Sequence, residues 1–79
     1  MINKDVFENM PIDLKGDFVF QKGTFVGSRV YGFLKMVLYK TDSFFVEVVY
    51  SIENNKIEDV IYISDSDVKR FYKVNFNKD

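Results

Sequence analysis

The chain has 79 residues and a net charge of −1, and it contains neither cysteine nor histidine. This length allows one domain, which buries only about 60% of its unfolded surface, and the absence of cysteine excludes disulfides and thiolate metal sites. The balanced charge argues against a strongly basic nucleic-acid binder, and an apolar fraction of 47% argues against a disordered chain. No apolar stretch is long enough for a membrane span, and the N-terminus lacks a secretory apolar run, so cytoplasm is the expected location.

Residues 1–16 are predicted to form an N-terminal arm or a short helix. Ile2, Val6 and Met10 follow one another at steps of four, which places them on one side of a helix. Pro11 is expected to end this helix, because the residue before a proline is pushed out of the α region.

Residues 17–63 are predicted to form an antiparallel β-meander. The stretch from Asp17 to Gln21 alternates and is aromatic, which favours a short N-terminal strand followed by a tight turn at Lys22-Gly23. Residues 24–26 would return beside it, with a bulge or kink at Gly27-Ser28. Three long strands are then expected over residues 29–40, 44–53 and 56–63.

A C-terminal helix is predicted over residues 64–76. Ser64 can cap it, and Asp65 and Asp67 suit the positive helix N-terminus. Val68, Phe71 and Tyr72 recur at helical spacing, so this helix has an apolar side that can cover the sheet. The expected fold class is therefore α+β, with three long strands, a short N-terminal strand and a C-terminal helix on one face.

The two turns of the meander decide which side chains share a face. If Asn54-Asn55 forms a two-residue turn and Thr41-Asp42-Ser43 a three-residue loop, then Leu34, Val48 and Ile61 meet at the centre of one apolar face. We expect this face to be the core. Asp59 is the one carboxylate predicted on it, beside Tyr50.

The opposite face of this sheet would alternate large aromatic residues with charges. Lys35 is expected to pair there with Glu47, and the N-terminal segment is the only part of the chain left to cover the face. Uncovered patches of this kind usually mark interaction sites, so a homodimer is expected through this face or through an exposed strand edge. The alternative is that residues 1–20 fold back over it. The predicted interaction residues are Arg29, Tyr31, Phe33, Lys35, Tyr39, Phe45, Val49 and Tyr62.

The octapeptide RVYGFLKM at residues 29–36 resembles the signature strand of the RNA-recognition motif. The resemblance implies that Tyr31 and Phe33 stack on bases and that Arg29 meets a phosphate. That family needs a strand, a helix and a strand before the octapeptide, and 28 residues containing Pro11 and three glycines hardly hold them. We therefore interpret the octapeptide as a central strand with a core side and an aromatic outer side.

A second resemblance covers roughly residues 25 to 63. A strand ending in Leu38-Tyr39, the segment Val46-Glu47-Val48, and an Asn turn followed by Ile57-Glu58 are similar to small uncharacterised β-meander proteins of Bacteroidota. No activity is implied by this resemblance.

The sequence offers little chemistry for catalysis. Nucleophilic and acid–base sites usually depend on histidine or cysteine, and both are absent. Asp65 and Asp67 are better explained by helix capping than by a cation, and no glycine-rich loop that could hold a phosphate precedes a helix. We expect no catalytic, cofactor-binding or metal-binding residues. The predicted function is a non-catalytic interaction or assembly module with an unknown protein partner. The alternative is single-stranded nucleic-acid binding through the aromatic face.

Overall fold

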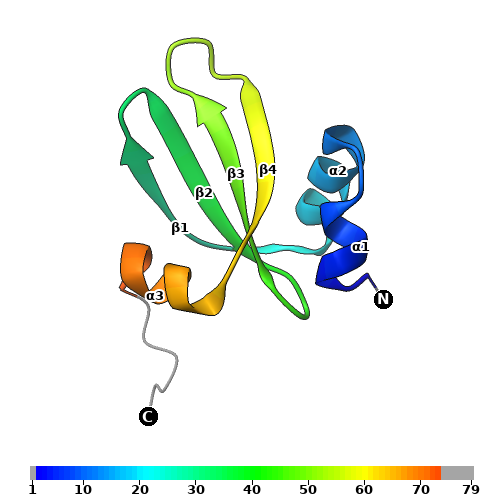
Figure 1. The fold of residues 1–79 in the computed structure, drawn as a ribbon. Coiled ribbons are helices and arrows are strands. Elements are labelled where there is room, and N and C mark those ends of the chain that lie inside the picture. Colours follow the sequence, from blue (N-terminus) through cyan, green and yellow to red (C-terminus); the bar gives the residue numbers. More distant parts are fainter. Residues whose placement is uncertain (1, 74–79) are drawn as a thin grey trace.

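The computed structural model describes residues 2–73, which form a twisted antiparallel sheet with helices on both faces (Figure 1). The strands follow in sequence order across the four-stranded sheet, so β1 and β4 are its edges. The predicted α+β class and the C-terminal helix are confirmed. In chain order the elements are α1 (Lys4–Glu8), α2 (Ile12–Lys22), β1 (Thr24–Tyr31), β2 (Leu34–Lys40), β3 (Phe45–Ser51), β4 (Ile57–Ile63) and α3 (Asp65–Tyr72).

The N-terminal segment contains two helices. Asn3 caps α1 by accepting a 2.9 Å hydrogen bond from the Val6 amide, and Pro11 separates α1 from α2. The predicted strand at residues 17–21 is wrong, because this stretch is the second half of α2. Gly16 and Val19 are both buried and lie three residues apart, which is a helical spacing that the alternation of aromatic residues obscured.

Gly23 ends α2 and leads directly into β1. Its amide donates to the Val19 carbonyl at 2.7 Å, and a Cβ atom at residue 23 would lie 2.6 Å from that carbonyl oxygen. Only glycine therefore fits between the helix and the sheet. The predicted turn at Lys22-Gly23 is thus a helix end rather than a hairpin, whereas the predicted irregularity near Gly27 is present as a bulge between Phe25 and Gly27.

The octapeptide at residues 29–36 is a hairpin and not a single strand. The expected strand over residues 29–40 is divided at Gly32-Phe33, where Tyr31 pairs with Leu34 across a two-residue turn. Gly32 has a φ of 61°, and Phe33 is not among the residues with positive φ, a combination typical of a type II′ turn. Tyr31 and Phe33 therefore cannot act as alternating residues of one RNA-contacting strand.

The loop between β2 and β3 has one residue more than predicted. Lys40 pairs with Phe45, so residues 41–44 form the connection. Thr41 closes it: its amide donates to the Phe44 carbonyl at 2.9 Å, and its buried hydroxyl bonds the same carbonyl at 2.8 Å. Since side chains alternate along a strand, one extra loop residue exchanges the faces of β2 relative to β3.

The β3–β4 connection is also longer than a two-residue turn. Strand β3 ends at Ser51 and β4 begins at Ile57, and Asn55 adopts the left-handed conformation with a φ of 57°. Val48 consequently pairs with Val60, and Ile61 pairs with Glu47. The predicted shared core face is wrong: register places Val48 on the opposite side of the sheet from Leu34 and Ile61. Asp59 is exposed.

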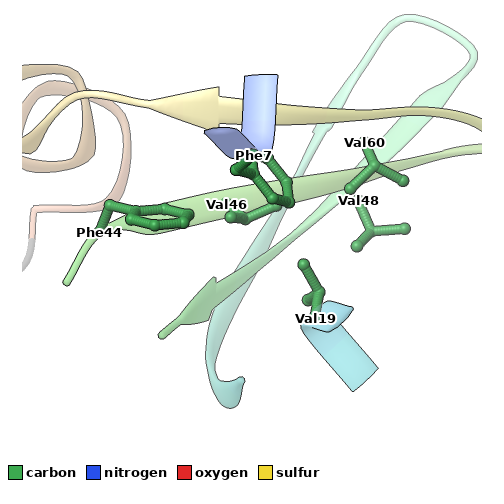
Figure 2. Packing of buried hydrophobic residues seen from close by; sticks show 6 residues of the cluster. All are labelled: Phe7, Val19, Phe44, Val46, Val48 and Val60. Atoms are coloured by element: carbon green, nitrogen blue, oxygen red, sulfur yellow. The ribbon is translucent and has the colours of Figure 1, made fainter. Parts of the chain in front are cut away.

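The larger core lies between the N-terminal helices and one face of the sheet (Figure 2). Phe7 from α1 and Val19 from α2 are fully buried there against valines of β3 and β4. The Phe7 ring lies 5.3 Å from the Phe44 ring, within the range of favourable aromatic pairs. The cluster consists of Phe7, Val19, Phe44, Val46, Val48 and Val60, and all of them except Phe44 are fully buried.

The smaller core lies on the other face, under α3. Val68 is fully buried against Leu38, Phe45 and Ile63. Ser64 caps α3 by accepting a 3.2 Å hydrogen bond from the Asp67 amide, so the predicted cap is confirmed. The helix ends at Tyr72, and residues 74–76 of the predicted helix lie outside the described residues.

Candidate functional site

The structure does not bring the predicted interaction residues together on one face. Register places Arg29, Tyr31, Phe45 and Val49 on the side of α3, whereas Lys35, Tyr39 and Tyr62 lie on the side of α1 and α2, and Phe33 is in the turn. Phe45 and Val49 are buried in the chain itself, at 5% and 7% exposure. The aromatic face inferred from the sequence is thus distributed over two faces.

Glu47 is the centre of a buried polar network on the α3 side. Its side chain is 1% exposed, and its carboxylate accepts hydrogen bonds from Arg29 Nε at 2.8 Å and Arg29 Nη2 at 3.2 Å. The Tyr72 hydroxyl donates to the same carboxylate at 2.6 Å. The guanidinium of Arg29 also lies 4.1 Å from the ring centroid of Phe71. Strands β1 and β3 and the last turn of α3 therefore meet at one carboxylate.

The ionisation of this network follows from its contacts. The hydrogen bond to Glu47 raises the pKa of Arg29, and this outweighs the opposite effect of burial. Burial raises the pKa of the Tyr72 hydroxyl, and its hydrogen bond to Glu47 raises it further. Tyr72 thus stays a hydrogen-bond donor at neutral pH. Arg29 and Tyr72 donate hydrogen bonds to one carboxylate and thereby fix α3 on the sheet, which is a structural role. We call Arg29, Glu47 and Tyr72 the Glu47 clasp.

Glu47 was predicted beside Lys35, but in the structure Lys35 pairs with Tyr50. Arg29 and Tyr72 were not recognised as partners of Glu47, because the shifted register separated them. One signal was present: Glu47 is the only charged residue in the apolar run from Phe44 to Tyr50, and a charge in such a strand needs a buried partner.

A second feature is a set of exposed apolar side chains on both faces of the edge strand β1 and at its turn, which we call the β1-edge patch. Phe33 is 86% exposed, Tyr31 71%, Val30 64% and Phe25 62%. Figure 1 shows β1 at the free edge of the sheet, away from α1 and α2. The residues of the β1-edge patch are Phe25, Val26, Val30, Tyr31 and Phe33.

Two open pockets lie among the described residues away from the Glu47 network. One of about 430 Å³ is lined by Ile2, Phe18, Lys22, Thr41 and Asp42, next to the loop between β2 and β3. Another of about 330 Å³ lies on the sheet face beyond the N-terminal helices, and it is lined by Lys35, Val37, Tyr50 and Asn55. Neither contains a converging set of charged groups that identifies a ligand.

Comparison of the chain with protein-family models, curated proteins and solved structures finds no match in any of the three. Within residues 2–73, no group of three or more acidic side chains is placed to hold a metal ion, and no helix is long and apolar enough to cross a membrane. The features that bear on function are therefore the Glu47 clasp and the β1-edge patch, and only the second is available to another molecule.

Proposed function

We propose that this protein is a non-catalytic protein-interaction or assembly module and that its contact surface is the β1-edge patch. The observation that carries the proposal is the exposure of Phe25, Val30, Tyr31 and Phe33 along one strand and its turn. Such side chains normally lose their contact with water by binding a partner. A cytoplasmic location and a homodimeric state belong to the same proposal.

The fold explains why these side chains remain uncovered. The helices at the start of the chain pack on the larger core, and α3 lies over the smaller one, so both helical layers are already used. Phe33 is at the tip of the β1–β2 hairpin, where it is 86% exposed. Aromatic residues at such sites provide large contact areas and few rotamers to immobilise, which suits protein binding.

The test is affinity capture of host proteins by the full chain, comparing wild type with the double variant Tyr31→Lys and Phe33→Glu. A matched control, Val6→Lys with Leu14→Glu, places the same charges on two other exposed apolar positions. We expect the control to retain the wild-type partners and the patch variant to lose them by at least tenfold. Equal capture by all three proteins, or no captured partner and no self-association, contradicts the proposal.

A second candidate function is single-stranded nucleic-acid binding. The exposed rings of Tyr31 and Phe33 lie at the β1–β2 turn, and exposed aromatic rings are what base stacking requires. Fluorescence anisotropy with a labelled oligonucleotide tests this candidate. Binding that weakens steeply as salt rises, and that is lost in the Tyr31→Lys and Phe33→Glu variant, supports it. No binding at low salt excludes it.

A further inference from the structure

The outer edge of β1 presents free backbone groups at known positions. Tyr31 and Leu34 flank a two-residue turn, so they form a hydrogen-bonded pair, and the pairing alternates from there along the hairpin. Ser28 and Val30 therefore direct their N–H and C=O groups away from β2. β1 is an edge of the sheet, so these groups have no strand partner among the described residues. An extended segment is the natural complement of such an edge.

Of the features that normally prevent strand pairing, the β1 edge has a bulge between Phe25 and Gly27, and the stretch from Ser28 to Tyr31 pairs regularly with β2. Edge strands are usually protected by lysine, proline or inward-pointing charges. Between Thr24 and Tyr31 the single charged residue is Arg29, and Glu47 and Phe71 already hold its guanidinium.

The opposite edge, β4, differs from β1 because it carries exposed acidic residues and because part of it packs against helices. Glu58 and Asp59 are exposed near its beginning. Its inner half packs against the N-terminal helices through Val60. Two β4 edges would repel each other, and pairing of β1 with β4 would leave both outer edges free for further copies. Pairing of β1 with β1 closes after two chains and leaves the acidic β4 edges outside.

We propose that a second copy of this chain binds here: two β1 strands pair antiparallel about a two-fold axis at Ser28 and join their sheets into one eight-stranded sheet. This inference rests on the proposed function, and it names the partner and the geometry. With the axis at Ser28, Val30 lies opposite Val26 of the second copy and Arg29 lies opposite Gly27. An axis at Arg29 would instead place two guanidinium groups opposite each other, which is unfavourable.

The geometry is tested by a single cysteine, because the chain contains none. In the proposed dimer the two Ser28 Cα atoms lie about 5.5 Å apart, within the range that a disulfide spans. Ser28→Cys should therefore form a covalent dimer on mild oxidation. Thr24→Cys, on the same strand, is the matched control: its copies lie eight positions out of register, roughly 27 Å apart at about 3.4 Å per residue. Equal cross-linking of both variants, or none of Ser28→Cys, overturns the inference.

Sedimentation equilibrium at micromolar concentration measures the assembly without cross-linking. Wild type should sediment at twice the 9.3 kDa of one chain. Val30→Lys places a charge on the β1 edge and should give a monomer, whereas Ile57→Lys, the same charge on the β4 edge, should remain dimeric. Circular dichroism must show that both variants are folded. If Val30→Lys does not fold, the comparison of Ser28→Cys with Thr24→Cys decides whether the β1 strands pair.

The outcomes separate this inference from the proposed function. A monomeric wild type that still captures a host protein through the β1-edge patch refutes the homodimer and leaves the interaction module standing. A monomer that captures nothing refutes both. A dimer that survives Val30→Lys and does not cross-link through Ser28→Cys refutes the β1 pairing alone.

Discussion

Replacement of Arg29 by methionine should destabilise the protein more than replacement of Arg29 and Glu47 together. Arg29→Met removes two of the three hydrogen bonds that Glu47 accepts and leaves a carboxylate that is 1% exposed without its cation. Removal of one partner from a buried ion pair costs about 3–5 kcal/mol. The Arg29 side chain is 24% exposed, so water can replace part of the loss, and we expect the lower end, about 3 kcal/mol.

The double variant Arg29→Met with Glu47→Met removes the charge that is left behind. Apolar replacement of both members of a buried pair is often nearly neutral, so the second substitution should restore stability. The hydroxyl of Tyr72 then lacks its acceptor, which limits the recovery by about 1–3 kcal/mol if water does not reach it. Addition of Tyr72→Phe to the double variant removes the hydroxyl that lacks an acceptor, so the recovery of stability should then be complete.

Urea denaturation monitored by circular dichroism measures these differences as shifts in the midpoint at constant slope. In a thermal melt, a loss of about 3 kcal/mol corresponds to a decrease of roughly 12–24 °C for a domain of this size. The reasoning is refuted if Arg29→Met costs less than about 1 kcal/mol, or if the double variant is less stable than Arg29→Met alone.

Three further predictions concern the helices. Ser64→Ala removes the cap of α3 and should cost about 1 kcal/mol in a chemical denaturation; a midpoint equal to that of wild type would contradict the cap. Phe7→Ala leaves a cavity in the larger core and should cost about 3–5 kcal/mol, so a melting temperature within a few degrees of wild type would show that α1 does not contribute to it. The pKa of Tyr72 is raised in the folded chain, so its contribution is complete below the ordinary value of 10.0 and is lost as pH rises above it; wild type should therefore lose more stability than Tyr72→Phe above pH 10, and parallel profiles would refute this.

The sequence predicted the parts of the fold that depend on local signals. The first helix before Pro11, the Ser64 cap and the bulge near Gly27 are all encoded within a few neighbouring residues. The position of the β3–β4 connection at Asn54-Asn55 was also predicted, but its length of two residues was wrong. These features need no knowledge of the rest of the chain.

Register was not predictable in the same way, because both faces of this sheet are apolar. In a meander with one solvent-exposed face, a one-residue shift in register is unfavourable because it buries charged residues. In this chain both registers bury valine and leucine, so the sequence pattern does not distinguish them. The deciding energies are tertiary: Thr41 closes a four-residue loop, and Glu47 requires Arg29 and Tyr72. The predicted interaction face was derived from the register, so its members were separated when the register shifted.

The α2 helix illustrates a second limit. Phe18 and Phe20 are two positions apart, as residues on one face of a strand would be, yet the segment is helical. Phe18 and Val19 pack on the larger core from this helix, and Gly23 allows the helix to end close to the sheet. The sequence predicted an exposed aromatic surface, but only two of the five residues of the β1-edge patch, Tyr31 and Phe33, were among the predicted interaction residues.

The packing of the N-terminal helices on β4 also fixes the order in which the molecule can assemble. Each strand pairs with its neighbour in sequence, so the meander can form hairpin by hairpin with only short loops to close. Phe7 and Val19, by contrast, reach their contacts with Val60 only after that strand has joined the sheet. Closure of this one long loop is therefore expected to be a late event in folding, and substitutions in α1 should accelerate unfolding more than they slow refolding.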